Sequence, residues 1–372
     1  AVPKPQLAGW NPVCGCRTPD KWSTYYGLSM RPKPTLERYE PPPPRCVSAM
    51  LNETEIAAIK TRIGDRVVIA SVSGGKDSTA MCLYLRELGI PYRAVNMDTG
   101  WEHADTDHYV REVLPKYIGP IETISAEIKP KPGKEAIIER FEKMIGRESQ
   151  MIRLVLNRGF MPSRLVRFCT IELKMDVFRR WIDILDDEPI SATGVRASES
   201  AKRSKYPEWE WWEKADCEQW RPLIHWSDQD VVDIHARHSV PPNPLYLRGA
   251  RRVGCWPCIH ARKSEIRNIA ESDPERIDLM EELEKVVTDM VKERHTERGE
   301  VSRFVHSGWF WNSNHHVDPD TGKPAGGAWR IRDVVQWSKT KRGGRQYEMF
   351  AAPDQEFGCM RWGVCDTGGG DD

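Results

Sequence analysis

Residues 67–89 read VVIASVSGGKDSTAMCLYLRELG, in which an apolar run, a pair of glycines and an amphipathic segment follow one another. The β-branched residues of 67–72 are typical of a parallel strand that is buried on both faces. From Asp77 to Leu88 the apolar side chains recur at helical spacing, and Gly89 can end the helix. This segment therefore predicts a strand, a tight turn and a helix.

The same alternation extends on both sides of this segment. Asn52 and Glu55 form a capping-box pattern that predicts a helix to about residue 62. Further strands are expected at 92–97, 121–124 and 190–193, with helices at 106–117, 134–145, 148–157, 172–184, 227–237, 261–270 and 274–294. Strands separated by helices predict βαβ units and a parallel sheet. We therefore expect a Rossmann-like α/β core, whereas no periodic pattern predicts an element after about residue 300.

Charge and hydropathy narrow the class of protein. Lys plus Arg and Asp plus Glu are equal at 55 each, so no overall basic field attracts nucleic acid, although a local patch can. No apolar run approaches the roughly 20 residues of a membrane span. The first residues lack the apolar core of a signal peptide. We expect a cytoplasmic protein without a membrane partner.

The turn Ser73-Gly74-Gly75-Lys76-Asp77-Ser78 has the features of a phosphate site. Two glycines let backbone N–H groups face a ligand, and the start of the following helix favours an anion. Ser73 and Ser78 add hydroxyl donors, and Lys76 adds a positive charge. The spacing differs from that of a Walker A loop. An ordinary βα turn is the alternative, but the combination favours phosphate binding.

This loop resembles the signature of the PP-loop ATP pyrophosphatases. That superfamily includes the sulfonucleotide (PAPS and APS) reductases, tRNA-thiolating enzymes and the ATP-pyrophosphatase subunit of DNA phosphorothioation systems. The resemblance covers most of residues 65–265 and is strongest to the PAPS reductase-like branch. It implies an adenine nucleotide α-hydrolase-like fold, in which residues 73–78 hold the pyrophosphate of ATP or the anionic end of a sulfonucleotide.

Five further blocks carry the resemblance in the same order along the chain. They are Asp98-Thr99-Gly100-Trp101-Glu102, Arg167-Phe168-Cys169-Thr170 with Lys174, Gly194-Val195-Arg196 with Arg203, Arg221-Pro222-Leu223, and the segment 243–258. The resemblance implies a second anion-binding element at Gly194, Arg196 and Arg203, where guanidinium groups suit phosphate or sulfate. It places Asp98 near Mg²⁺ or the ribose.

Cys169, Cys255 and Cys258 match cysteines of the family, and the resemblance implies a [4Fe-4S] cluster. Soft thiolates also suit zinc, and a Cys-Trp-Pro-Cys pair can be redox-active or simply buried, so these alternatives stay open. Cluster-bearing reductases usually have adjacent cysteines, but Phe168 and Thr170 flank Cys169 here. The fourth iron site could therefore hold Cys217, a distant cysteine such as Cys359, or a sulfide.

The cysteines near the chain ends have no assigned role. PAPS reductases carry a nucleophilic cysteine in a Glu-Cys-Gly-x-His tail, whereas residues 356–360 read EFGCM. Cys359 could still attack a sulfur centre. Alternatively it could ligate metal with Cys14, Cys16 and Cys365, or all four could be plain thiols. We divide the chain into a Pro-rich extension (1–50), a PP-loop nucleotide-binding domain (51–245) and a C-terminal cysteine-containing helical region (246–372).

We expect an enzyme that uses ATP and Mg²⁺ to adenylate a substrate, releasing pyrophosphate, for sulfur transfer. Its candidate catalytic residues are Lys76, Asp77, Asp98 and Arg196. The sulfur would come from the cluster or from a donor protein of the cysteine desulfurase type. A local basic rim would suit a nucleic-acid substrate; it comprises Lys202, Arg203, Lys205, Arg248, Arg251 and Arg252. The alternatives are a sulfonucleotide reductase and a non-catalytic nucleotide-sensing or DNA-binding subunit.

Overall fold

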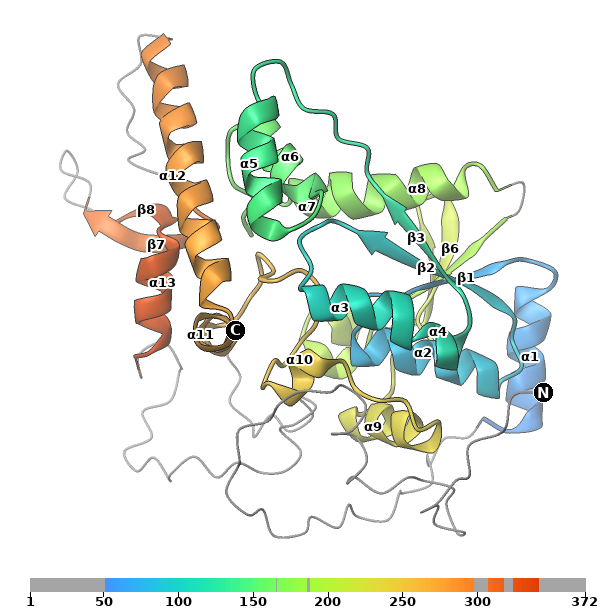
Figure 1. Cartoon of the computed structure of the whole chain (residues 1–372). Coiled ribbons are helices and arrows are strands. Elements are labelled where there is room, and N and C mark those ends of the chain that lie inside the picture. Colours follow the sequence, from blue (N-terminus) through green and yellow to red (C-terminus); the bar gives the residue numbers. More distant parts are fainter. Residues whose placement is uncertain (1–50, 165, 186–187, 298–306, 318–323, 341–372) are drawn as a thin grey trace, which may run out of the picture.

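The structure is a computed structural model that describes residues 51–164, 166–185, 188–297, 307–317 and 324–340. Its centre is a six-stranded sheet in the order β3-β2-β1-β4-β6-β5 (Figure 1). All neighbouring strands pair in parallel except β5, which pairs antiparallel with β6 at one edge. The strands are β1 Val68–Ser71, β2 Tyr92–Asp98, β3 Ile121–Ser125, β4 Ile190–Ala192, β5 Trp209–Trp212 and β6 Cys217–Trp220. The predicted α/β parallel sheet is confirmed.

Helices cover both faces of the sheet, as the apolar run of β1 requires. Val68 and Ala70 face a core shared with α2 (Lys76–Glu87) and α9 (Asp228–Arg237). Ile69 points the other way, into a core shared with α8 (Asp176–Ile182). Successive strand residues thus bury opposite faces, which is why the strand reads as continuously apolar.

Most predicted helices are present, with some changes of geometry. The capping box of Asn52 and Glu55 opens α1. The helix expected at 106–117 is divided by a π-turn at Tyr109–Val113, which widens the backbone before Pro115 begins the next helix. The remaining bounds are α1 Glu53–Ile63, α3 Ala104–His108, α4 Pro115–Ile118, α5 Glu135–Ile145, α6 Gln150–Arg158, α7 Phe168–Thr170, α10 Pro244–Leu247, α11 Lys263–Ser272, α12 Pro274–Glu297 and α13 Ile331–Ser338.

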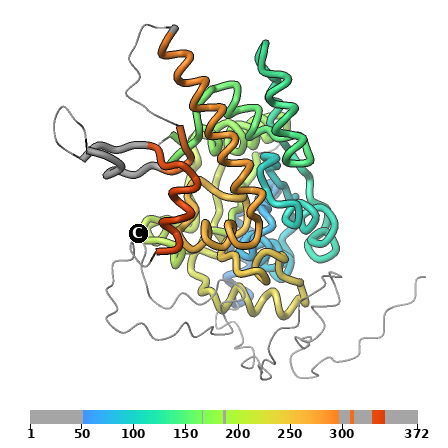
Figure 2. Tube along the Cα trace, turned by 60° about the vertical axis from the view of Figure 1, so that its left-hand side comes forward, coloured from blue at the N-terminus to red at the C-terminus, as the bar shows by residue number. Residues whose placement is uncertain are grey.

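A second apolar core lies beyond the sheet. It joins α5 and α6 to α11, α12 and α13, with Trp101 and Trp309 stacked at 5.0 Å between ring centroids. The hairpin of β7 (Phe310–Val317) and β8 (Pro324–Trp329) and the helix α13 were not expected from the sequence. Figure 2 shows α11, α12 and α13 packed together on one side of the core. Among the described helices, none has both the length and the apolarity to span a bilayer.

A buried carboxyl group joins this C-terminal part to α12. Glu284 is only 4% exposed and accepts hydrogen bonds from the backbone N–H groups of Ile331 (2.8 Å) and Trp309 (3.3 Å). Burial raises the pKa of Glu284 from 4.5 to about 8, although the two N–H donors lower it. Between the two pKa values, 4.5 and about 8, the folded protein therefore keeps a proton on Glu284 that the unfolded chain has released.

We expect the free energy of unfolding to fall as the pH rises from about 5 to about 8, because the folded state binds the extra proton there. Glu284→Gln cannot titrate and should flatten this slope. Urea unfolding of both proteins across this pH range measures the difference in slope. An unchanged slope in the variant would assign the pH dependence to another group.

Candidate functional site

The loop 73–78 connects β1 to α2 at the carboxyl end of the central strand. From β1 the chain runs outward to β2 and β3, then returns to place β4 on the other side of β1. In open α/β sheets, ligands bind in the crevice where the strand order reverses. The loop after β1 and Gly194 after β4 flank this crevice.

Two glycines allow the backbone to close up around the loop. A Cβ on Gly194 would lie 2.6 Å from the carbonyl oxygen of Asp77 and 2.9 Å from the nitrogen of Ser78. Gly74 has a φ of +75°, and a Cβ there would lie 2.8 Å from a methyl carbon of Val110. Both positions therefore need glycine, and the structure places the predicted second anion element directly against the first turn of α2.

The loop is held by its own serine and by the segment 243–246. The Ser78 hydroxyl accepts a hydrogen bond from the Ser73 N–H at 3.2 Å and donates to the Gly75 carbonyl at 3.0 Å. The Tyr246 hydroxyl accepts from the Lys76 N–H at 3.0 Å. Tyr246 lies in the segment 243–258 that carries the family resemblance, but no role was predicted for it. Its neighbours in the sequence give no sign of a contact with a residue 170 positions away.

Four charged side chains meet at the start of α2. The Lys76 ammonium lies 3.7 Å from carboxylate oxygens of Asp77 and of Asp228. The Arg196 guanidinium, which is 2% exposed, bridges the same carboxylates at 2.6 and 2.5 Å. Burial alone would lower the pKa of Arg196, but the two carboxylates raise it, so it stays charged. We call Lys76, Asp77, Arg196 and Asp228 the charged quartet.

Asp228 was missed as a site residue. In the sequence it is an acid in the first turn of a helix, and the helix dipole alone accounts for such a position. Its contacts with Lys76 and Arg196 depend on the fold. In the sequence, the only signal was an acidic residue at the start of the helix expected at 227–237.

The other predicted residues lie at different distances from the quartet. Arg203 pairs with Glu199, which also accepts a hydrogen bond from the Arg196 N–H at 2.9 Å. Asp98 accepts from the Gly100 N–H at 2.8 Å and pairs with two arginines, Arg111 at 3.0 Å and Arg147. No contact within the described residues joins Asp98 to the quartet, so its contact with Mg²⁺ or ribose stays a prediction.

The expected basic rim is partly neutralised by its neighbours. Arg203 pairs with Glu199, Arg248 with Asp105, and Arg252 with Glu265 at 4.0 Å. The side chains of Lys202 and Lys205 are exposed. Paired guanidinium groups attract a polyanion less than free ones, so this rim supports a nucleic-acid substrate only weakly.

The segment 98–102 holds the Cys-x-x-Cys loop. The Trp101 indole donates to the Pro257 carbonyl at 3.1 Å, and the Trp256 N–H donates to the Trp101 carbonyl at 3.1 Å. The Cys255 thiol lies 3.9 Å from a carboxylate oxygen of Glu102. The block that follows β2 therefore positions the cysteine pair as well as the nucleotide side of the sheet.

The three family-matched cysteines gather around Lys174. Burial raises the pKa of Cys255 to about 11, the positive charge of Lys174 opposes this, and Cys258 and Cys169 add to it. In turn Cys255, together with Glu102 and Cys258, raises the pKa of Lys174. The sequence alone did not reveal that Lys174 lies close enough to these thiols to influence their pKa values.

The donor set suits an iron–sulfur cluster in chemistry, because thiolates are soft ligands. Three of the four iron ligands would be Cys169, Cys255 and Cys258. Cys217 packs with Phe178 in a separate apolar cluster, away from these three. Over the described ranges, no three His, Cys, Asp or Glu side chains lie in an arrangement that could hold a metal ion, so Cys169, Cys255 and Cys258 would have to move closer together to bind one. The predicted ligands Cys14, Cys16, Cys359 and Cys365 lie outside the described residues.

Tyr246 gives a direct test of the loop. Burial raises the pKa of its hydroxyl, so the group stays neutral while it accepts a hydrogen bond from the Lys76 N–H. Tyr246→Phe should lower the free energy of unfolding by about 1–3 kcal/mol, because a buried N–H loses its partner. It should also weaken ATP binding about tenfold. Thermal unfolding with and without ATP measures both effects, and unchanged ATP affinity would exclude a role in binding.

Comparisons with known proteins show which family the chain resembles. The family model described as phosphoadenosine phosphosulfate reductase domain matches residues 67–261. An uncharacterised 37.8 kDa protein of Escherichia phage 186 is 33% identical over 80% of this chain and 96% of its own. The adenosine 5'-phosphosulfate reductase of Allochromatium vinosum is 29% identical over 53% of this chain and 69% of its own. The PAPS reductase of Candida auris, solved as a phosphate complex, aligns with a TM-score of 0.39 and 16% identity over 56% of this chain and 89% of its own.

Proposed function

This chain belongs to the phosphoadenosine phosphosulfate reductase domain family, and on that basis we propose that it is an ATP pyrophosphatase that activates a substrate for sulfur transfer. The loop 73–78 would bind the β- and γ-phosphates of ATP. The α-phosphate would then lie toward Gly194 and Arg196, on the other side of the crevice. The observation that carries the proposal is the charged quartet at the start of α2.

The quartet supplies what phosphoryl transfer needs. Lys76 and Arg196 are cations that can neutralise charge on the phosphates, and their fixed positions reduce reorganisation during reaction. Asp77 and Asp228 offer hard carboxylate oxygens, which suit Mg²⁺ held with the help of substrate phosphates. Bound there, Mg²⁺ would supply further charge neutralisation.

The reaction is a displacement at phosphorus. An oxygen of the substrate attacks the α-phosphorus, and the bond to the bridging oxygen breaks. Pyrophosphate leaves with the electron pair, and the substrate keeps the AMP group. Arg196 and the N–H groups of the loop would hold the non-reacting phosphate oxygens in line. Sulfide, released from the persulfide of a donor protein by an external thiol that supplies two electrons, would then attack the carbon that bears the adenylated oxygen. The C–S bond forms as the C–O bond breaks, and AMP leaves with that oxygen and the electron pair.

The cysteines provide the sulfur side of the proposal. We propose that Cys169, Cys255 and Cys258 hold a [4Fe-4S] cluster, with zinc as the alternative, and that Lys174 balances its negative charge. A donor protein of the cysteine desulfurase type would supply sulfur, and the acceptor could be a nucleic acid. Segment 98–102 contacts the cysteine loop, so the two sites lie on one connected frame.

Pyrophosphate release tests the proposal directly. The protein, purified without oxygen, is incubated with ATP and Mg²⁺, with and without candidate acceptors, and pyrophosphate and AMP are quantified. Pyrophosphate is expected when an acceptor is present, and free AMP is expected in equal amount only after sulfide is added, because AMP stays on the acceptor until sulfur displaces it. Tight ATP binding without any cleavage under these conditions would favour the non-catalytic, nucleotide-sensing alternative.

A sulfonucleotide reductase is the second candidate, favoured by the relative from Allochromatium vinosum that carries this name. Such an enzyme would release sulfite from APS or PAPS with an external thiol as reductant. The absence of a cysteine beside Cys169 counts against it, because Phe168 and Thr170 occupy those positions. Sulfite release from PAPS or APS, without pyrophosphate release from ATP, would select this function.

Metal content tests the cysteine assignment. Iron, sulfide and zinc are measured in the wild type and in Cys255→Ala after anaerobic purification. We expect near-complete loss of iron and sulfide in the variant. Cys82→Ala is the matched control, since Cys82 is a buried thiol of α2 in a different core. Equal iron in all three proteins would contradict the assignment.

A further inference from the structure

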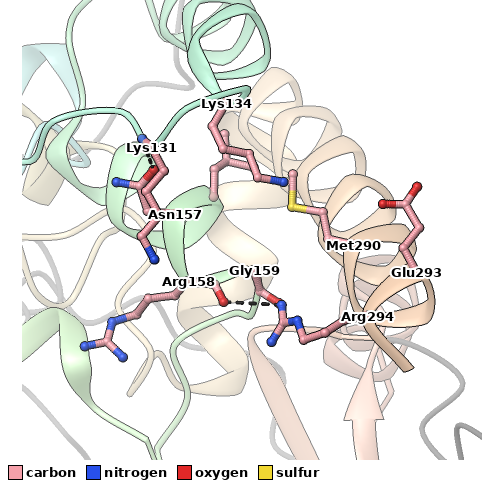
Figure 3. A pocket seen from close by; sticks show the side chains of 9 residues that line it. Lys131, Lys134, Asn157, Arg158, Gly159, Met290, Glu293 and Arg294 are labelled. Carbon is pink, nitrogen blue, oxygen red and sulfur yellow. Dashed lines mark hydrogen bonds between the residues drawn. The ribbon is translucent and has the colours of Figure 1, made fainter. Parts of the chain in front are cut away.

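A cavity of about 410 Å³ lies between the segment before α5, the end of α6, and α12 (Figure 3). It shares no residue with the charged quartet or with the cysteine group. Its lining contains four cationic side chains and one carboxylate, namely Lys131, Lys134, Arg158, Arg294 and Glu293. Leu156 and Met290 complete it with apolar surface. We call it the α6–α12 cavity.

The walls of this cavity are fixed by hydrogen bonds. The Arg294 guanidinium donates to the carbonyls of Gly159 at 2.9 Å and Arg158 at 3.3 Å. Gly159 has a φ of +65°, and any Cβ there would collide with that guanidinium. Asn157 accepts from the Lys131 N–H at 2.9 Å and donates to the Lys129 carbonyl at 2.8 Å. These hydrogen bonds hold the lysine-bearing segment before α5 on one wall of the cavity and Arg294 on the opposite wall.

The cavity keeps a net positive charge, although Glu172 pairs with Arg158 and the carboxylate of Glu293 is among its lining residues. Lys131 and Lys134 form no ion pair with any described carboxylate, whereas Arg158 is paired with Glu172. The partners of Arg294 are carbonyl oxygens, which orient its charge without neutralising it. Figure 3 shows Lys134 and Arg294 reaching into the space from the α5 side and from α12. An anion is the ligand that this arrangement favours.

The lysine-rich segment before α5 suits more than one phosphate. Residues 129–134 read KPKPGK, so lysines recur along a segment stiffened by two prolines. The side chains of Lys129 and Lys131 are exposed, which continues the positive surface beyond the cavity. Lysine and arginine neutralise successive phosphates of a nucleic-acid backbone in this way.

We propose that the α6–α12 cavity binds the phosphate backbone of a polynucleotide strand. Lys131 and Lys134 contact phosphates, and Arg294 supplies a fixed guanidinium that can pair with one of them. This assignment deepens the proposed function by giving a nucleic acid a binding surface, and it can fail or hold separately from ATP cleavage because the two sites have no residue in common. Free pyrophosphate carries the same chemistry and is the other source of phosphate to be tested.

The test compares two double variants of equal charge. Lys131→Ala/Lys134→Ala removes the unpaired lysines of the cavity. Lys143→Ala/Lys292→Ala is the control, since these lysines lie on α5 and α12 in ion pairs with Glu139 (2.6 Å) and Asp289 (3.5 Å) and do not line the cavity. Binding of a fluorescein-labelled 20-nucleotide single-stranded DNA is followed by anisotropy at several salt concentrations, with saturating ATP at the nucleotide site.

The cavity variant should bind the DNA at least about tenfold more weakly, and the slope of log affinity against log salt should become shallower by about 1.4, because each lost phosphate contact on a single strand contributes about 0.7. The control and the ATP affinity of both variants should stay at wild-type values. If inorganic pyrophosphate binds and K131A/K134A weakens it while DNA does not bind, the phosphate site stands but its ligand is small. Equal affinities of the wild type and both variants for DNA and pyrophosphate would overturn the proposal.

Discussion

Arg196→Met should lower pyrophosphate release from ATP by at least about a hundredfold, the range seen when one preorganised donor is removed from a transition state. Arg196 is the buried bridge between Asp77 and Asp228. Without it, two carboxylates remain close together beside the bound phosphates and repel them. Lys76 alone lies too far, at 3.7 Å, to form a short hydrogen bond with either carboxylate.

The same change should destabilise the protein. Breaking a buried ion pair costs about 3–5 kcal/mol, and the partial exposure of Asp77 and Asp228 should keep the effect at the low end. The double variant Arg196→Met/Asp228→Asn removes the repulsion and leaves buried Lys76 paired with Asp77, so it should recover much of the stability but no turnover. Urea unfolding and pyrophosphate release separate the two effects. Full turnover in a folded Arg196→Met protein would exclude Arg196 from the chemistry.

The strand, loop and helix of residues 67–89 could be predicted because their causes are local. Apolar side chains on both faces of β1, two glycines, and helical spacing after Asp77 act within a few residues of one another. The order of the sheet follows from right-handed crossovers between such units. The position of the loop at the reversal between β1 and β4 then follows from the fold class.

The rest of the site depends on contacts between distant segments. Asp228 and Tyr246 reach the loop from α9 and α10, and no pattern around either residue indicates a partner so far along the chain. Lys174 was read only as part of a motif, yet it lies among thiols from two separate segments. Only the packed fold sets such distances.

The missed strands had misleading sequences. β5 and β6 were not predicted; in the fold Trp209 stacks on Trp220 at 4.7 Å across a hairpin, while Trp211 is 61% exposed at the sheet edge. β8 contains Gly326 and Gly327, which weaken any strand signal. Pairing with a neighbour, rather than intrinsic preference, stabilises both hairpins. The division of the chain near residue 245 stays a prediction.

Gly194→Ala should couple a loss of stability to a loss of ATP affinity. The new Cβ would sit 2.6 Å from the Asp77 carbonyl and 2.9 Å from the Ser78 nitrogen, and both are backbone atoms that cannot turn aside. Overpacking of this kind costs about 1–3 kcal/mol. The first turn of α2 must shift to relieve it, and this shift displaces the N–H groups and Lys76 that would hold phosphate. Gly194→Val should amplify both losses.

Gly119→Ala is the matched control. It adds the same methyl group where nothing lies within 4 Å, although its φ of +87° carries a backbone cost of about 1–2 kcal/mol. The two variants should therefore unfold at similar urea concentrations, yet only Gly194→Ala should lose ATP affinity in calorimetric titration. If both retain wild-type affinity, the close contact between β4 and α2 is a packing feature alone. If only Gly194→Ala loses ATP affinity, the nucleotide binds at the first turn of α2. The two variants have similar stability, so the position of the added methyl group is what distinguishes them.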